Sequence, residues 1–274
     1  MKFALCNEIM KEWEIERQFE VAAEIGFDAL EIAPFTLNDW VQEITEEQKQ
    51  RIRQAAADTG VAAAGIHWLL VGPSGLHITD PDPTVRARTT AYCQDLVRFG
   101  LEIGAVYEVV GSPAQRSRGE GMIYHDCWEW FKEAMVACAQ VEGAEGFQVC
   151  IEPLAPSTNN NFLFNHLEVV KLCREIDLPN VGVILDTYSG LQTESDLPAA
   201  IRETGDLLRH YHCNDLNQRA PGWGDVDFRP IMRALLDIDY QGYASIEVFD
   251  FDPEPAEHAR IGLETLKQAL ADVS

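Results

Sequence analysis

The sequence predicts a single (β/α)8 TIM barrel of class α/β that spans residues 1–274. Three observations predict it: eight apolar segments of strand length, helical patterns between them, and no composition break or long linker along the chain. A chain of 274 residues with 46% hydrophobic content can bury one large core. An open doubly wound sheet is less favoured, because no GxGxxG sequence follows the first expected strand.

The expected strands are short apolar runs bounded by polar or turn-forming residues. Runs that are apolar on consecutive residues are typical of parallel strands that are covered on both faces. Eight of them match the number of strands in a closed barrel of this class. They cover residues 2–6, 29–33, 61–67, 106–110, 147–151, 181–185, 208–212 and 243–248.

Helical patterns lie between these strands. Residues 15–26, 46–60 and 166–180 carry apolar side chains at i, i+3 and i+4 spacing, and the first two segments end at a glycine that suits a helix C-cap. Residues 68–85 are too rich in Pro and Gly for a helix, so we expect a long loop there, over the mouth of the barrel.

Charge and composition narrow the possible partners. The formal net charge of −24 opposes binding to nucleic acids and to anionic membranes. No apolar run approaches the roughly 18 residues of a membrane span, and the N-terminus becomes acidic too early for a signal peptide. The seven cysteines show no CxxC spacing and are typical of reduced core residues. We therefore expect a cytoplasmic protein with a small-molecule substrate, no nucleic-acid partner and no membrane partner.

Four residues of metal-ligand type stand at the ends of the last four expected strands. They are Glu152, Asp186, His212 and Glu247. The C-terminal ends of barrel strands converge on one face, where three carboxylates without a cation would repel one another. Oxygen donors with one imidazole suit Mn²⁺, Mg²⁺, Co²⁺ or Zn²⁺. We expect one divalent ion at these residues, with Mn²⁺ as the first choice.

Alternatives exist for individual residues of this group. Taken singly, each is more often a member of an ion pair than a metal ligand, and only the four together favour a site. His210 points the same way as His212 and is the alternative ligand, although it lies one layer deeper in the barrel. For Glu31, the alternative to a functional role is an ion pair with a neighbouring basic residue.

These residues occur in segments that resemble the xylose isomerase-like TIM barrels, a family that includes ketose 3-epimerases, hydroxypyruvate isomerase, inosose isomerases and dehydratases, and endonuclease IV. The resemblance implies that Glu152, Asp186, His212 and Glu247 bind one divalent metal, and that the two glutamates also act as acid and base. Related barrels often form homodimers, which makes a homodimer possible here. The segments that carry the resemblance are GFDALEIAPF, GIHWLL, CIEPLAP, GVILDTYSG, HYHCND, PGWGDVDF and YASIEVF.

The chain also departs from parts of this family. In ketose 3-epimerases the corresponding segment resembles IEPLNR and is closely followed by a second glutamate. This chain instead reads IEPLAPSTNNN, with Thr158 where that glutamate would be expected. Ser189 stands where they commonly carry a histidine. A close D-tagatose or D-psicose epimerase is therefore not our expectation. Endonuclease IV has an Asp-x-His motif where residues 225–227 read Asp-Val-Asp, so a three-metal phosphodiesterase is not expected either.

Four further residues are candidates for substrate binding. His67 could donate a hydrogen bond to a substrate hydroxyl, although a satisfied core histidine is equally compatible with the sequence. Trp68 follows it, and Tyr188 stands on another loop at the mouth, where a sugar ring can stack on an aromatic side chain. Arg219 could bind a carboxylate or a sugar oxygen, or be a solvated loop residue.

Together these features predict a divalent-metal-dependent isomerase or epimerase. Its substrate would be a small sugar or polyhydroxy carbonyl compound, and the proton transfer would pass through a metal-stabilised enediolate. The alternative enzyme is a metal-dependent lyase of the inosose or dehydroshikimate dehydratase type, because the same intermediate can expel a hydroxyl group. A non-catalytic barrel that only binds a ligand is the third possibility.

Overall fold

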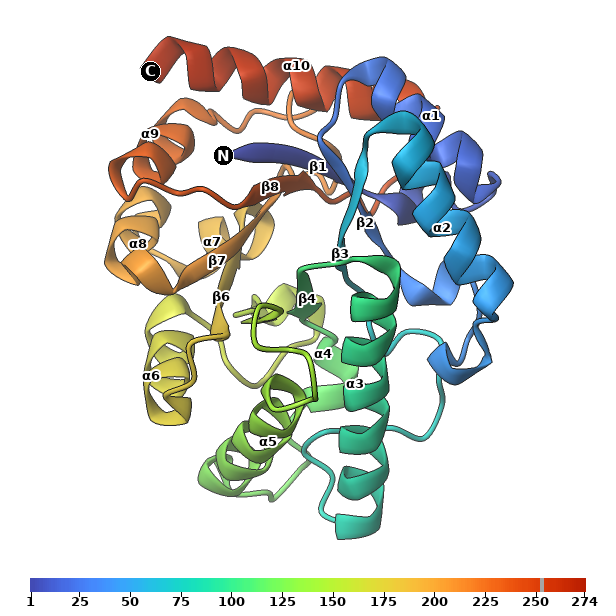
Figure 1. Cartoon of the computed structure of the whole chain (residues 1–274). Coiled ribbons are helices and arrows are strands. Elements are labelled where there is room, and N and C mark those ends of the chain that lie inside the picture. The colour runs from blue at the N-terminus through green and yellow to red at the C-terminus, as the bar shows by residue number, and fades with distance from the viewer. Residues whose placement is uncertain (252–253) are drawn as a thin grey trace.

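The chain folds into a closed barrel of eight parallel strands (Figure 1). The structure is a computed structural model and describes residues 1–251 and 254–274. Each strand pairs with the next, and β8 closes the barrel against β1. This confirms the fold class and all eight expected strands. The strands are β1 Lys2–Cys6, β2 Ala29–Ile32, β3 Ala62–Ile66, β4 Tyr107–Val110, β5 Gln148–Ile151, β6 Val181–Asp186, β7 Leu208–Cys213 and β8 Tyr243–Ile246.

Helices surround the barrel on its outside (Figure 1). They are α1 Ile15–Ile25, α2 Glu46–Thr59, α3 Pro83–Ile103, α4 Pro113–Arg116, α5 Tyr124–Ala139, α6 His166–Ile176, α7 Thr187–Thr193, α8 Leu197–Thr204, α9 Arg229–Asp237 and α10 Pro255–Val273. Short 3-10 segments add η1 Asn7–Met10, η2 Pro34–Thr36, η3 Val41–Glu43, η4 Pro156–Thr158 and η5 Gly205–Leu207.

The sequence explains where these helices begin and end. In α2, the Thr45 hydroxyl accepts the Gln48 backbone N–H while the Gln48 side chain accepts the Thr45 N–H, which forms a capping box. Helix α1 ends at Gly26, whose φ of 96° is a left-handed conformation that residues with a Cβ rarely adopt. The expected helix 166–180 stops earlier than predicted, because Asp177 adopts this conformation after Ile176.

The long loop expected at residues 68–85 is present between β3 and α3. Its predicted end was three residues too late, since α3 begins at Pro83 with Asp82 as its N-cap. Proline is favourable in the first turn of a helix because its missing N–H would have no partner there. Within the loop, Trp68 has a positive φ of 50°, a conformation that indicates local strain at the top of β3.

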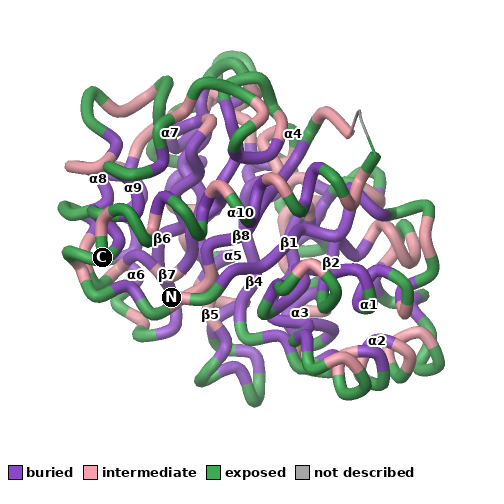
Figure 2. Tube along the Cα trace, turned by 90° about the horizontal axis from the view of Figure 1, so that it is seen from above, coloured by how far each residue is buried: buried purple, intermediate pink, exposed green. Residues whose placement is uncertain are grey.

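Two layers of side chains form the core. The inner layer fills the barrel with mainly small residues and with Tyr107, whose ring stacks on the His210 imidazole at a centroid distance of 4.3 Å. The outer layer packs the helices on the strands, so that the strands are buried and the exposed residues lie on the helices and loops (Figure 2). All seven cysteines are buried and unpaired by disulfides.

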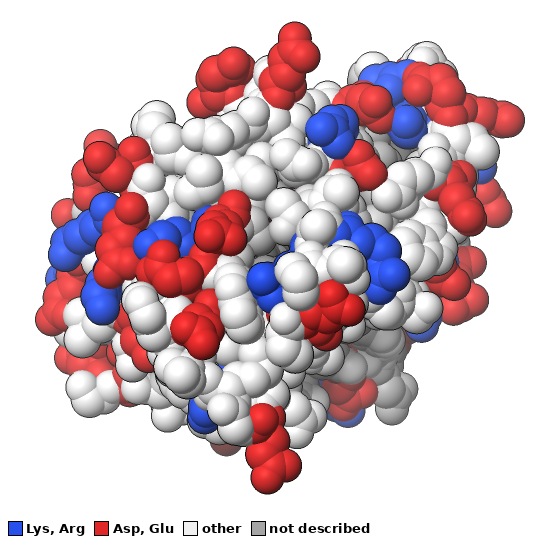
Figure 3. Space-filling view, turned by 90° about the horizontal axis from the view of Figure 1, so that it is seen from below, with Lys and Arg blue, Asp and Glu red and all other residues white. Residues whose placement is uncertain are grey.

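On the face that Figure 3 shows, acidic side chains are spread widely, with lysines and arginines between them. This distribution accompanies the formal net charge of −24, and such a surface repels phosphate backbones at long range. In the part of the chain that the structure describes, no helix combines the length and the apolar character that a membrane crossing requires.

Candidate metal centre

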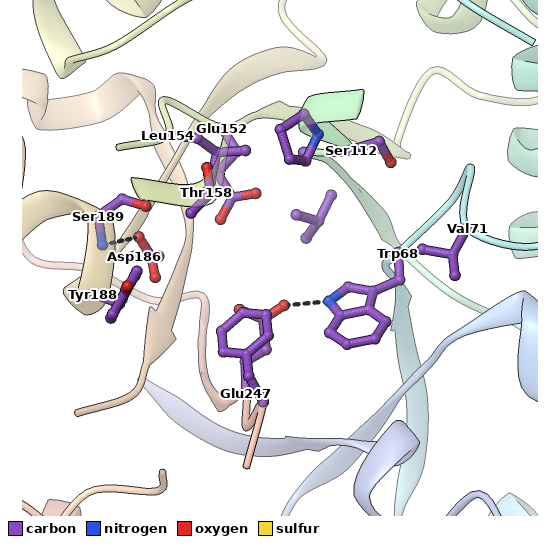
Figure 4. Close-up of a pocket in the computed structure, with 14 residues that line it drawn as sticks. Trp68, Val71, Ser112, Glu152, Leu154, Thr158, Asp186, Tyr188, Ser189 and Glu247 are labelled. Carbon is purple, nitrogen blue, oxygen red and sulfur yellow. Dashed lines mark hydrogen bonds between the residues drawn. The ribbon is translucent and has the colours of Figure 1, made fainter. Parts of the chain in front are cut away.

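A cavity of about 280 Å³ opens at the C-terminal ends of the strands. Its walls come from the segments that follow β3, β4, β5, β6 and β8, which places it where barrels of this class carry their sites (Figure 4). The lining residues are Trp68, Val71, Val109, Gly111, Ser112, Pro113, Glu152, Leu154, Thr158, Asp186, Tyr188, Ser189, Glu247 and Phe249.

Three of the four predicted metal ligands lie close together at this cavity: Glu152 and Glu247 line it, and His212 lies beside them outside the lining. Glu152, His212 and Glu247 each offer one donor atom, and these atoms lie within 4.8 Å of one another. All three residues are buried, and they come from the ends of β5, β7 and β8. Two carboxylates and one imidazole at this separation form a donor set that suits a divalent cation. The residues therefore fit the metal that the sequence predicts.

The fourth predicted ligand, Asp186, lines the same cavity but lies outside this group of three. Its Oδ1 accepts the Ser189 backbone N–H at 2.7 Å, because Asp186 is also the N-cap of α7 (Figure 4). Its Oδ2 accepts a hydrogen bond from Asn214 Nδ2 at 3.0 Å. Asp186 is thus held by protein groups and still retains lone pairs that a cation could use.

The electrostatics of the carboxylates favour a cation between them. Burial, together with the charges of Glu247 and Asp186, raises the pKa of Glu152 well above its usual value. Burial and the charge of Glu247 likewise raise the pKa of Asp186. Burial opposes ionisation of Glu247 as well, but the charge and hydrogen bond of His212 lower its pKa. A divalent ion would relieve the repulsion among these carboxylates.

His210, the alternative ligand, lies deeper in the barrel than His212. Its Nε2 is 2.7 Å from Glu31 Oε1, and its ring packs on Tyr107. His210 does not line the cavity, but with Glu31 and His212 it forms a second group of possible metal donors. Glu31 has imidazoles as its basic neighbours, in agreement with the ion pair considered for it.

Two of the predicted substrate-binding residues line the cavity. The Trp68 Nε1–H donates to Glu247 Oε1 at 2.7 Å (Figure 4). The indole is stacked between Phe35 and Phe249 at centroid distances of 5.7 and 5.6 Å, which holds its ring in place. Tyr188 lies on the opposite side of the cavity from Trp68.

The other two predicted substrate-binding residues lie outside the cavity lining. His67 is fully buried, and its Nε2 is 2.7 Å from Glu8 Oε2. Arg219 forms an ion pair with Asp250, with 2.8 Å between Nε and Oδ2. Both side chains therefore already have carboxylate partners within the protein.

The residues that replace the ketose 3-epimerase pattern both line the cavity. The Thr158 hydroxyl donates to the Ala155 carbonyl at 2.8 Å, so it is turned toward its own loop. Ser189 is buried, and its Oγ has no hydrogen-bond partner among the residues described. Small uncharged hydroxyl groups thus stand at the two positions where the family pattern has a carboxylate and an imidazole.

Arg116 is a charged residue near the site that no sequence pattern indicated. It is fully buried at the end of α4, and its positive charge acts on Glu152. Burial lowers the pKa of Arg116 to about 10. Its Nη1 donates to the Val110 carbonyl at 3.2 Å, whereas Nε and Nη2 lack hydrogen-bond partners within residues 1–251 and 254–274. An arginine in a polar loop segment is typical of solvated surface, so the sequence carried no signal for this burial.

Comparisons with known proteins agree with this architecture. Residues 19–269 match the family model of the xylose isomerase-like TIM barrel. The chain is 32% identical over 289 residues to 3-dehydro-D-guloside 4-epimerase of Escherichia coli K12. This alignment covers 97% of this chain and 99% of that protein. It is also 30% identical over 252 residues to D-psicose 3-epimerase of Ruminiclostridium cellulolyticum. This alignment covers 87% of this chain and 80% of that protein.

A solved structure supports the fold. The apo crystal structure of 3-keto-D-glucoside 4-epimerase from E. coli superposes with a TM-score of 0.83 at 23% identity and covers 98% of this chain and 99% of that chain. Because the family match spans most of the sequence, the protein belongs to the xylose isomerase-like TIM barrel family.

Proposed function

We propose that this protein is a divalent-metal-dependent epimerase or isomerase of a small sugar or related polyhydroxy carbonyl compound. The observation that carries the proposal is the close grouping of Glu152, His212 and Glu247, of which the two glutamates line a cavity at the C-terminal face of the barrel. The similar proteins named above are sugar epimerases, which supports the same class of reaction. We propose Glu152, Asp186, His212 and Glu247 as the metal-binding residues, and Mn²⁺ as the ion.

The two glutamates are the proposed acid and base. Glu152 and Glu247 enter the cavity from opposite edges (Figure 4), an arrangement that suits removal of a proton on one side of a carbon and its return on the other. A bound divalent ion would polarise the carbonyl and stabilise the enediolate. The Trp68 Nε1–H donates to Glu247 Oε1 at 2.7 Å, so this carboxylate is oriented before a substrate arrives.

The cavity lining supports an uncharged substrate. No Lys, Arg or His side chain lines the cavity in the described part of the chain, so no basic side chain there would bind a phosphate group. Tyr188 and Ser189 offer hydroxyl groups on one side, while Trp68 and Phe249 offer aromatic surface on the other. We propose Trp68 and Tyr188 as substrate-binding residues. The buried and ion-paired positions of His67 and Arg219 give these two residues less support.

Reaction assays on metal-stripped protein test the proposal. The stripped protein should be inactive on a panel of ketoses and 3-keto-glycosides and should regain activity with Mn²⁺ or Co²⁺. In deuterated water, epimerisation through an enediolate places solvent deuterium on the product while leaving its carbon skeleton unchanged. Loss of water from the product would instead identify a dehydratase. Full activity without metal, or binding without any exchange of deuterium, would contradict the proposed mechanism.

A further inference from the structure

The carboxylate of Glu31 lies below the candidate metal centre, outside the cavity lining, and faces two imidazoles from β7. Its Oε2 is 3.2 Å from His212 Nε2, and its Oε1 is 2.7 Å from His210 Nε2. All three side chains are fully buried, so water does not compete for these contacts. One carboxylate thus bridges the two histidines that alternate along this strand.

The other nitrogen of His212 faces the candidate metal centre. His212 Nδ1 is 3.2 Å from Glu247 Oε2, which belongs to the group of three donors. A neutral imidazole carries its proton on one nitrogen and a lone pair on the other, and only the lone pair can bind a metal. Both nitrogens of His212 thus face a carboxylate at 3.2 Å. If Glu247 binds a cation, Glu31 is the carboxylate that remains to hold the proton, and Nδ1 is then available as a ligand.

We propose that Glu31 is a positioning residue, which holds the His212 proton on Nε2 and thereby presents the Nδ1 lone pair to the metal. Histidine ligands commonly donate their second N–H to a carboxylate, which orients the ring and makes it a better donor. The inference rests on the proposed function insofar as it concerns metal binding. Glu31 would then determine metal affinity, although it does not line the cavity and is not one of the three donors Glu152, His212 and Glu247.

Two other groups lie near this pair, but neither offers His212 Nε2 an acceptor as good as the Glu31 carboxylate. Cys6 Sγ is 3.9 Å from His212 Nε2, and a thiol is a much weaker acceptor than a carboxylate. His67 Nδ1 is 3.9 Å from Glu31 Oε2, and the other nitrogen of His67 is occupied by Glu8 at 2.7 Å. Of these groups, Glu31 alone offers a carboxylate within 3.2 Å of His212 Nε2.

Glu31→Gln is the informative variant. Glutamine keeps the shape of the side chain, but its neutral carbonyl oxygen is a weaker acceptor than a carboxylate. The His212 Nε2–H therefore loses its charged partner whichever way the amide turns. Glu8→Gln is the matched control, because Glu8 is equally buried and also contacts an imidazole, that of His67, which lies outside the three-donor group.

Metal titration by calorimetry with Mn²⁺ and Zn²⁺ gives the first readout. We expect Glu31→Gln to bind the metal about 10- to 100-fold more weakly than the wild type, and Glu8→Gln to bind it within about twofold. Equal affinities of the wild type and Glu31→Gln would overturn this inference and leave the proposed function standing. Failure of the wild type to bind any divalent ion would overturn the proposed function itself.

Nitrogen-15 NMR of the wild type gives a second readout that does not depend on the variant folding. On addition of diamagnetic Zn²⁺, the resonance of His212 Nδ1 should shift while Nε2 keeps its proton. A shift of Nε2, with the proton on Nδ1, would overturn the assignment of Glu31.

Discussion

Glu108 permits a quantitative test of burial in this barrel. The residue lies in β4, is only 1% exposed, and has an Oε2 without a hydrogen-bond partner among the described residues. Burial raises the pKa of Glu108 to about 8, from a usual value of 4.5. The folded protein therefore binds this proton more tightly than the unfolded chain does, and ionisation of the carboxyl destabilises the fold.

The sign and size of the effect follow from these two pKa values. Below pH 4.5 the carboxyl is protonated in both states and gives no penalty, whereas above pH 8 the full penalty is present. Between the two values the free energy of unfolding falls as pH rises, because the folded state holds more protons. At about 1.4 kcal/mol per pKa unit, the penalty is roughly 1 kcal/mol at pH 5, 3 at pH 7 and 5 at pH 8.5.

Glu108→Gln removes the ionisable group and keeps the shape of the side chain. Urea unfolding followed by tryptophan fluorescence at these three pH values measures the free energy of unfolding of both proteins. Relative to the wild type, the variant should gain stability as pH rises, by about 4 kcal/mol between pH 5 and pH 8.5. The exposed Glu145→Gln should show no such trend. A Glu108→Gln difference that does not change with pH would refute the reasoning.

Three further predictions concern the site and the barrel beneath it. Trp68→Phe keeps the aromatic stack but removes the hydrogen bond to Glu247, so kcat/KM should fall about 10- to 100-fold in a steady-state assay, and an unchanged value would contradict that role. Gly65→Ala places a Cβ 2.1 Å from the Tyr107 ring and should lower the free energy of unfolding by at least about 1–3 kcal/mol, unlike Gly146→Ala, which meets no atom within 4 Å. Mn²⁺ at 100 times its Kd should raise Tm by about 5–10 °C in a thermal melt, and an unmoved Tm would argue against a metal site.

The sequence was most informative where local patterns and barrel geometry act together. A run of consecutive apolar residues requires cover on both faces, so strands such as 147–151 could be placed from residue order alone. A polar residue at the end of such a run, such as Glu152, has to face the mouth of the barrel. Glu152 lines the cavity at this mouth, and its role as a metal ligand stays a prediction.

Other features of the site depend on contacts between distant segments. Glu31 and His212 are 181 residues apart in the chain, and their hydrogen bond exists only because the barrel closes. The same holds for the contact of Trp68 with Glu247, which are 179 residues apart. The residues that flank Arg116 in the sequence are polar, so they did not indicate that its charge would be buried and act on Glu152.

The sequence by itself determined the class of fold, the number of strands and the residue types at their ends, because periodicity and burial act over neighbouring residues. Only the tertiary structure decided which nitrogen of His212 faces Glu247, how Asp186 is held, and why His67 and Arg219 lie outside the cavity lining. The physical reason is that a hydrogen bond requires its two atoms to lie within about 3 Å and in the correct orientation. Such precision arises from packing of the whole barrel, and no local pattern in the chain encodes it.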